Sequence, residues 1–304
     1  MSAVIIDCDP GIDDALALFV ACASPEIELE AVTTVAGNRP VEQTSRNAAR
    51  VLYAAGRGDT PVLRGCARPL AYPEPRCNCI HGLDGLGGST LPAGRPLMER
   101  HAVEFLARAL SEERHDPPVL IAMGPLTNLA VLEIEHPGIL KRAKCLLIMG
   151  GAAFRPGNVT PNAEYNFHAD ALAAHTVLNS GARIFLFGLD VTMKAAVSEK
   201  WLESVGQLGT RCGLAAHQML RSYAVRDPAL HDACPVGYLL APHLFAGTAC
   251  RVSVDWQSGI TEGRLRAQPA LDAADAEGKS VEVFTTVDAE GLMSLVRSRI
   301  AALP

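Results

Sequence analysis

Short, wholly apolar segments alternate with amphipathic ones along the first two thirds of the chain. The apolar segments that predict buried strands are 3–7, 29–35, 119–123, 145–149 and 183–188. Helical periodicity between them predicts helices at 12–23, 41–55, 98–111 and 168–179. Uniformly apolar strands need cover on both faces, and strands that alternate with helices usually form a parallel sheet. We therefore expect an α/β fold with an open, mostly parallel sheet flanked by helices.

The last third of the chain has a different pattern. Segment 221–240 predicts two helices separated by a proline break, and 251–257, 263–268 and 281–287 predict a small antiparallel addition near the C-terminus. A final helix is expected at 289–302, whereas 56–97 is rich in Gly, Pro and Arg and predicts loops. No repeat or linker divides the sequence, so we expect a single domain over 1–304 with a Rossmann-like core.

Composition excludes several classes of partner. The 304 residues carry 27 Lys and Arg against 33 Asp and Glu, a net charge of −6, so the basic footprint of a nucleic-acid binder is missing. No apolar run reaches the ~18–20 residues of a membrane span, and the N-terminus has no basic start of a signal peptide. The nine cysteines are scattered without a Cys-x-x-Cys pair. This pattern favours buried or idle thiols in a reducing cytoplasm, so we expect a cytoplasmic protein with no membrane or nucleic-acid partner.

Four carboxylates follow the first predicted strand within eight residues: Asp7, Asp9, Asp13 and Asp14. Ligands of open α/β sheets bind at the carboxyl ends of the strands, which is where this cluster is expected. Asp13 and Asp14 could simply cap the following helix, but capping explains neither Asp7 nor Asp9. Carboxylates this close repel one another, and a hard divalent cation with oxygen ligands, such as Ca²⁺, relieves the repulsion.

The segment Asp-Cys-Asp-Pro-Gly-Ile-Asp-Asp-Ala at 7–15 resembles the aspartate motif of the nucleoside hydrolases, the inosine–uridine-preferring type. Further segments resemble that family in the same order: 35–38, 81–88, 123–130, 149–151 with 158–166, and 230–236. The resemblance covers about three quarters of the chain, from residue 5 to about residue 240.

The resemblance implies a role for each matching residue. Asp9, Asp14 and Asp232, with the backbone carbonyl of Met123, are expected to bind Ca²⁺, and Asp9 is also expected to be the general base. His231, beside the ligand Asp232, is the expected acid for the leaving base. Asp7 matches the motif, and we expect it to support the ligand residues without binding the ion or the substrate itself. The expected substrate contacts are Asp13, Asn38, His81, Met149, Asn158, Glu164, Asn166 and Tyr223.

These roles imply Ca²⁺-dependent hydrolysis of the N-glycosidic bond of ribonucleosides, inosine- or uridine-like, to free base and ribose, for nucleoside salvage or catabolism. Because no protein nucleophile is expected, we predict inversion at C1′. The family commonly forms dimers or tetramers, so a homodimer or homotetramer is expected.

Three alternatives remain open from the sequence. One is a pyrimidine-specific ribonucleoside hydrolase, and another is a non-catalytic nucleoside- or calcium-binding protein. The third is a phosphohydrolase of the haloacid dehalogenase type, which also places Asp-x-Asp after its first strand. That type usually has Thr or Val at the position where this sequence has Gly11.

Overall fold

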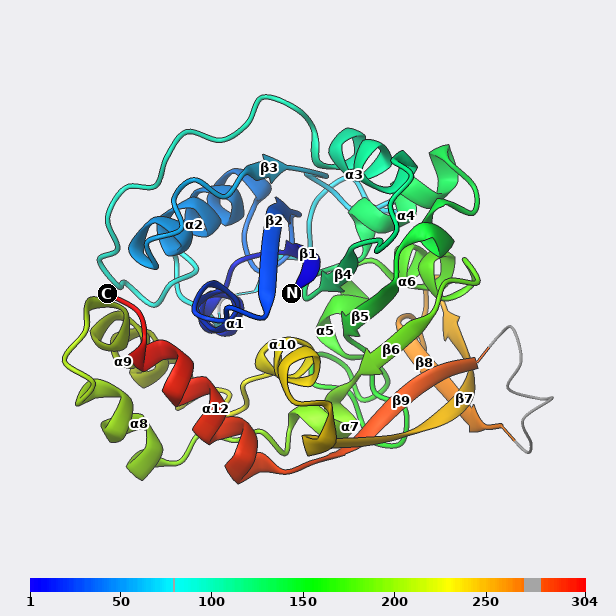
Figure 1. Cartoon of the computed structure of the whole chain (residues 1–304). Helices are drawn as coiled ribbons and strands as arrows, with labels where there is room; N and C mark the ends of the chain where they lie inside the picture. The colour runs from blue at the N-terminus through cyan, green and yellow to red at the C-terminus, as the bar shows by residue number, and fades with distance from the viewer. Residues whose placement is uncertain (79, 271–279) are drawn as a thin grey trace.

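One sheet organises the chain, and its strands run in the order β3-β2-β1-β4-β5-β6-β9-β7-β8 (Figure 1). The structure is a computed structural model that describes residues 1–78, 80–270 and 280–304. The strands within these residues are β1 (Ser2–Cys8), β2 (Ile27–Thr34), β3 (Val62–Arg64), β4 (Val119–Ala122), β5 (Cys145–Met149), β6 (Ile184–Phe187), β7 (Phe245–Asp255), β8 (Arg264–Pro269) and β9 (Ser280–Val287).

The sheet is parallel from β3 through β6, as the apolar strand pattern predicts. β7 pairs antiparallel with both β8 and β9, which confirms an antiparallel part near the C-terminus. One detail differs from the expectation. The predicted strand 281–287, part of β9, also pairs in parallel with β6, so β9 joins the two parts of the sheet instead of belonging to the addition alone.

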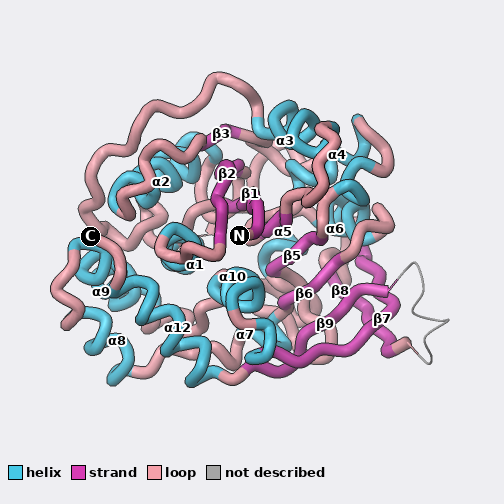
Figure 2. The backbone as a smooth tube through the Cα atoms, viewed as in Figure 1, coloured by secondary structure: helices cyan, strands magenta, loops and turns pink. Residues whose placement is uncertain are grey.

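Helices cover both faces of the sheet, each over its own apolar core (Figures 1 and 2). Successive side chains of β1 point to opposite faces, so Val4 and Ile6 pack in one core and Ile5 in the other. The first face carries α1 (Ile12–Cys22), α2 (Val41–Ala54), α9 (Arg211–Tyr223), α10 (Ala233–Leu240) and α12 (Ala289–Ala301). The second face carries α3 (Ala102–Ser111), α4 (Thr127–Glu135) and α6 (Ala171–Leu178). None of the described helices is long and apolar enough to cross a membrane.

Shorter helices complete the connections: α5 (Tyr165–Ala169), α7 (Leu189–Thr192), α8 (Glu199–Gly206) and the 3₁₀ turns Ile139–Arg142 and Pro242–Leu244. The helix predicted at 168–179 is interrupted at Asp170, where α5 ends and α6 begins. The Asp170 carboxylate accepts hydrogen bonds from the backbone N–H of Ala173 at 3.1 Å and of Leu70 at 2.9 Å. A tertiary contact thus turns a mid-helix residue into an N-cap.

The predicted helix 98–111 begins only at Ala102. The backbone N–H of Met98 donates to the carbonyl of Val62, at the start of β3, and so holds Met98 in an extended segment. Strand β3 itself lies in 56–97, where the sequence predicted loops.

Strand order reverses beside β1, because β2 and β3 lie on one side of it and β4, β5 and β6 on the other. Ligands of open α/β sheets bind at the carboxyl ends of strands at such a switch point. β1 ends just before Asp9, β4 just before Met123, and β5 at Met149. The fold therefore brings predicted site residues from three strands to one edge.

Candidate active site

The aspartates after β1 converge with one from the start of α10. The Asp14 carboxylate accepts hydrogen bonds from the backbone N–H groups of Asp9 at 3.3 Å and Gly11 at 2.9 Å. Asp232 precedes α10 on the same face of the sheet. Carboxylate oxygens of Asp13, Asp14 and Asp232 all lie within 4.8 Å of one another, and all three side chains are buried.

Asp9 lies beside this group, enclosed by two backbone segments. Its Oδ2 accepts a hydrogen bond from the backbone N–H of Asn38 at 2.6 Å. A Cβ on Gly37 would lie 2.0 Å from Oδ2, and one on Gly124 would lie 2.5 Å from Oδ1, so only glycine allows this approach. The sequence predicted Asp9, Asp14 and Asp232 as metal ligands, whereas the three carboxylates grouped here include Asp13 in place of Asp9.

Burial and mutual repulsion make these acids hard to ionise. Burial first, and then the charge of Asp13, raises the pKa of Asp14 to about 7. Burial likewise raises the pKa of Asp9 and of Asp232 well above the usual range, and neighbouring aspartates add to the effect. Among the described residues that line the adjoining pocket there is no lysine or arginine.

A hard cation fits this donor set. Asp13 Oδ1 is buried without a hydrogen-bond partner among the described residues, so its lone pairs are available to a ligand. Carboxylate oxygens and backbone carbonyls are the ligands that Ca²⁺ prefers, and its flexible coordination tolerates an irregular cluster. Asp13, Asp14 and Asp232 are therefore the residues best placed to hold such an ion.

The polar wall of the pocket is built around Glu164. Its Oε2 accepts hydrogen bonds from the backbone N–H of Gly151 at 2.8 Å and Phe167 at 3.1 Å, which caps α5 and fixes the carboxylate. Asn166 Nδ2 donates to the carbonyl of Met123 at 2.7 Å and also contacts Sδ of Met149 at 3.2 Å. These side chains supply the mixed donors and acceptors that sugar hydroxyls require.

The opposite wall is aromatic. The rings of His81 and Tyr223 stack with centroids 5.1 Å apart. His81 Nδ1 accepts a hydrogen bond from the backbone N–H of Ile12 at 3.0 Å, and burial lowers the pKa of His81 to about 4, so the ring is neutral. Tyr223 Oη lies 3.4 Å from Oδ2 of Asp13.

His231 completes this wall and is held at both ring nitrogens. Nδ1 lies 2.7 Å from Oγ1 of Thr192, and Nε2 lies 3.1 Å from Oδ2 of Asp227. Burial acts to lower the pKa of His231, but the hydrogen bond and charge of Asp227 outweigh it, and the pKa is raised.

Asp7 lies in the sheet at the end of β1. Its Oδ1 accepts hydrogen bonds from Thr33 Oγ1 at 2.5 Å and from Asn128 Nδ2 at 2.7 Å. Burial raises its pKa to about 7. Asp7 is not among the described residues that line the pocket.

Most of the predicted residues share this one pocket. It is lined by Asp13, Asn38, Met123, Met149, Asn158, Glu164, Asn166, Tyr223, His231, Asp232 and His81. Sequence reasoning missed four more, namely Asn78, Ile80, Tyr165 and Asp227. Asp227 left little signal, because its spacing of four residues from His231 indicates contact only within a helix. Asn78 left none, since its role depends on a hydrogen bond from Nδ2 to Asn38 Oδ1, 40 residues away.

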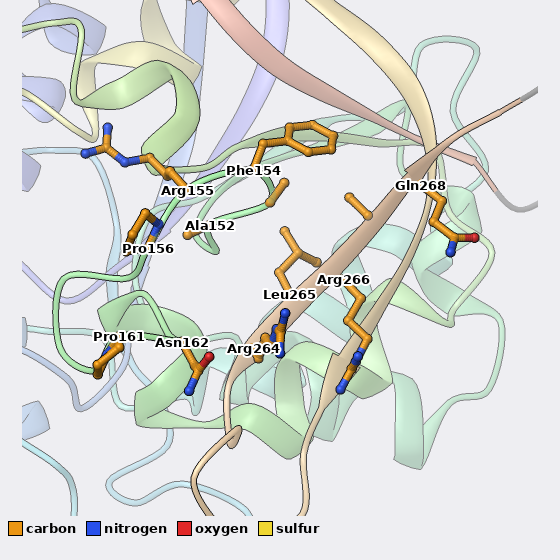
Figure 3. Close-up of a pocket in the computed structure, with 12 residues that line it drawn as sticks. Ala152, Phe154, Arg155, Pro156, Pro161, Asn162, Arg264, Leu265, Arg266 and Gln268 are labelled. Atoms are coloured by element: carbon orange, nitrogen blue, oxygen red, sulfur yellow. The ribbon is translucent and has the colours of Figure 1, made fainter.

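A larger hollow of about 490 Å³ lies elsewhere, between 152–162 and β8 (Figure 3). Figure 3 shows Leu265 and Arg266 on the β8 side of the hollow, whereas the Arg155 side chain points away from them. Arg266 is paired with Asp255 at 2.7 Å, and Arg155 donates to a backbone carbonyl. No carboxylate or imidazole is among the described residues that line this hollow, so acid–base chemistry belongs to the smaller pocket.

Known proteins match the chain over nearly its whole length. Residues 4–294 match the family model described as inosine-uridine preferring nucleoside hydrolase. The chain is 37% identical to the pyrimidine-specific ribonucleoside hydrolase RihA of Photobacterium profundum, with 98% of each chain covered. It is 36% identical to the non-specific ribonucleoside hydrolase RihC of Klebsiella pneumoniae, with 99% of each chain covered.

Solved structures give the same result. A plant nucleoside hydrolase superposes with a TM-score of 0.90 at 33% identity, over 99% of both chains. The purine-preferring ribonucleoside hydrolase from Gardnerella vaginalis superposes with a TM-score of 0.90 at 28% identity, over 99% of this chain and 98% of the other. The chain therefore belongs to the inosine-uridine preferring nucleoside hydrolase family and is an N-glycosidase of the ribonucleoside hydrolase class.

Proposed function

We propose that the protein is a Ca²⁺-dependent enzyme that hydrolyses the N-glycosidic bond of ribonucleosides to free base and ribose, for nucleoside salvage or catabolism. One observation carries the calcium dependence. Asp13, Asp14 and Asp232 are buried within 4.8 Å of one another, beside a pocket whose described lining has no cationic Lys or Arg. Buried like charges of this kind call for a bound cation.

The carboxylates would hold the ion, and we extend the ligand set to Asp9 and to the backbone carbonyl of Met123. When bound, the ion supplies positive charge that polarises the attacking water and the sugar hydroxyls. Asp9 accepts the proton of that water as general base, and its raised pKa suits the task near neutral pH. Asn38 fixes Asp9 through the hydrogen bond to Oδ2.

The polar wall binds the ribose. We assign its hydroxyls to Asp13, Glu164 and the side-chain amides of the wall: Asn38, Asn158 and Asn166. Met149 packs against the sugar. Held in this way, the ribosyl group develops positive charge at C1′ next to fixed carboxylates, which stabilise it electrostatically.

The aromatic wall receives the base, with His81 and Tyr223 against it and His231 beside it. The water oxygen bonds to C1′ as the C1′–N bond breaks, and the bonding pair leaves with the base. His231 supplies the proton that neutralises the departing base. Because the water attacks directly, the configuration at C1′ inverts.

Base preference is the finer part of the proposal. The relatives are named pyrimidine-specific, non-specific and purine-preferring, so the family name alone leaves the preference open. We propose hydrolysis of both inosine and uridine, and strict pyrimidine specificity is the alternative. A non-catalytic binding protein is the second alternative.

We propose that the Gly-rich loop 81–88 closes over the bound substrate and excludes water. His81, at the start of this loop, lines the pocket together with Ile80.

We also propose a cytoplasmic homodimer or homotetramer. The cytoplasmic location is supported by thiols that carry no disulfide: Cys8, Cys22, Cys66, Cys145, Cys212, Cys234 and Cys250. Cys79 lies outside the described residues.

One panel tests the proposal. Inosine, adenosine, guanosine, uridine and cytidine are each incubated with the purified protein, and released reducing sugar is measured with and without EDTA. We expect turnover of inosine and uridine that EDTA abolishes and added Ca²⁺ restores. Turnover that persists in EDTA would contradict the calcium dependence. Nucleoside binding without any released sugar would favour the binding protein.

A further inference from the structure

We propose that Asn78 is a positioning residue that fixes the side-chain amide of Asn38 and, through it, the carboxylate of Asp14, which is placed to hold Ca²⁺. The inference rests on the proposed function and adds to it a residue outside the family-like segments 35–38 and 81–88. Asn78 lies in the connection between β3 and α3 and lines the pocket.

The side chain of Asn38 lies between the aspartates and Asn78. Its Nδ2 donates to Oδ2 of Asp14 at 3.3 Å and to the backbone carbonyl of Asp9 at 3.2 Å. Its Oδ1 accepts a hydrogen bond from Nδ2 of Asn78 at 2.8 Å. A Cβ on Gly11 would lie 2.8 Å from Nδ2 of Asn38, so glycine at that position leaves room for the amide. Because Asn38 is buried, water does not readily replace these partners.

Two amides therefore lie in series between two backbone groups that cannot reverse their roles. At one end the N–H of Ile80 donates to Oδ1 of Asn78 at 3.0 Å, and a backbone N–H can only donate. At the other end the carbonyl of Asp9 accepts from Asn38, and a carbonyl can only accept. Reversing either amide would place oxygen against oxygen or N–H against N–H. The observed orientation is the one that satisfies every contact of the series, and it directs Nδ2 of Asn38 at Asp14.

The chain segment that carries Asn78 is held against the polar wall. Oη of Tyr165 donates to the backbone carbonyl of Arg76 at 3.0 Å, and Nη1 of Arg76 donates to the carbonyl of His168 at 2.8 Å. Tyr165 and His168 both belong to α5, the helix of that wall. The amide of Asn78 therefore approaches Asn38 from an anchored backbone.

Loss of Asn78 would release the amide of Asn38. Oδ1 of Asn38 would lose its partner in a buried site, and the amide would turn to bring that oxygen to water in the pocket. The rotation would take Nδ2 away from Asp14, which would keep only its bonds from the N–H groups of Asp9 and Gly11. Outer partners of this kind orient metal ligands, and their removal usually weakens metal binding about 10- to 100-fold. We expect the low end of that range, because the other two donors to Asp14 stay in place.

The test measures Ca²⁺ binding by isothermal titration calorimetry, without nucleoside, on metal-free wild type, Asn78→Ala, Asn38→Ala and the double variant. We expect Asn78→Ala to raise the Kd for Ca²⁺ about tenfold. Asn38→Ala should raise it by at least as much, because it removes the donor itself. Since Asn78 acts through Asn38, the double variant should match Asn38→Ala within about twofold, as expected for residues of one hydrogen-bond network.

Turnover gives a second readout. The Ca²⁺ concentration for half-maximal hydrolysis of uridine should rise in Asn78→Ala by the same factor as the Kd. At saturating Ca²⁺ kcat should fall less than about threefold, since excess ion restores occupancy and Asp9 keeps its hydrogen bond from the backbone of Asn38. A role in the fold alone would lower kcat and the melting temperature without shifting the calcium dependence.

Two further variants calibrate the result. Asn179→Ala removes an exposed amide outside the pocket lining, which donates from Nδ2 to the carbonyl of His175 at 2.8 Å, and it should bind Ca²⁺ with wild-type affinity. Asn78→Ser can still accept from the N–H of Ile80, because Ser makes the same local turn, but its shorter side chain does not reach Asn38. Asn78→Ser should therefore lose affinity as Asn78→Ala does, and it keeps the test open if Asn78→Ala is unstable.

The outcomes separate the two proposals. Asn78 variants with the wild-type Kd, or losses that add in the double variant, would overturn the positioning role and leave the hydrolase function intact. A wild type that binds Ca²⁺ but releases no sugar from any nucleoside would overturn the proposed activity and leave the role of Asn78 in calcium binding intact. A wild type that binds no Ca²⁺ would overturn the calcium dependence, and the role of Asn78 with it.

Discussion

Acidic side chains occur in two very different settings in this molecule. At the carboxyl end of β1, Asp13 and Asp14 are buried beside Asp232 with no Lys or Arg in the described pocket lining. On the antiparallel part, the exposed Arg266 side chain pairs with Asp255 through both carboxylate oxygens.

The contrast separates stability from function. The paired carboxylate of Asp255 has a lowered pKa, because Arg266 donates to it. The buried cluster has raised pKa values and therefore opposes folding wherever its members must ionise. Groups that violate local energetic preference in this way usually mark a functional site.

The largest expected effect is at Asp9. Asp9→Asn keeps the shape and can still accept the hydrogen bond from Asn38, but it removes the base, so kcat should fall by about 10²- to 10⁴-fold. The folded state raises the pKa of Asp9, so an ionised Asp9 costs stability at pH values above the ordinary Asp range. Without metal at pH 8, the variant should therefore have at least the wild-type free energy of unfolding. Near-normal kcat in steady-state assays would refute the base assignment.

His81→Ala should have a smaller effect, mainly on KM. The change removes the ring stacked on Tyr223 and the acceptor for the Ile12 N–H. An aromatic contact contributes about 0.5–1.5 kcal/mol, so we expect KM for uridine to rise up to about tenfold. His217→Ala, whose ring lies outside the pocket, is the matched control. An unchanged KM in His81→Ala would mean that this ring does not contact the substrate.

Glu262→Gln tests an acidic side chain that shares one property with each setting, because it is buried and also paired with an arginine. Glu262 is buried near the start of β8 and accepts a hydrogen bond from Tyr72 Oη at 2.6 Å, while Arg76 lies 3.2 Å from its Oε1. Gln removes the charge that balances Arg76, so the free energy of unfolding should fall by about 1–3 kcal/mol. We expect kcat to stay within about twofold in the same preparations. A free energy of unfolding equal to that of the wild type in urea denaturation would show that the ion pair with Arg76 contributes nothing to stability.

The smallest effect is expected for Asp255→Asn. Exposed ion pairs contribute little because water screens the charges and the long side chains lose freedom when they pair. The variant should match the wild type in melting temperature and in kcat. A clear loss of either would contradict the distinction between the functional buried cluster and the exposed pair of Asp255 and Arg266.

The sequence predicted the parallel core well because its strands are uniformly apolar and its helices amphipathic. The same pattern placed Asp9 and Asp14 at the edge where ligands bind. It failed where a distant contact overrides a local preference. Asp170 caps α6 through the local N–H of Ala173, but the distant donors Leu70 and Thr127 fix its carboxylate where the sequence pattern continues a helix.

The aromatic wall was predicted only in part, for a related reason. His81, Tyr223 and His231 stood out as ring side chains within or near the family-like segments. Asp227 is recognisable only once its oxygen is seen beside Nε2 of His231, because the segment between them is not a helix. Spacing of four residues indicates contact on a helix, but outside one it carries little information.

The position of β9 between β6 and β7 has a consequence for biosynthesis. The β7–β8 hairpin leaves the ribosome first, yet its place at the edge of the sheet exists only after β9 has paired with β6. Until residue 287 has emerged, the nascent hairpin has no docking strand, and the edge of β6 stays open. A stop codon that removes only β9 and α12 would therefore leave both strands of the hairpin intact but without the strand on which they dock.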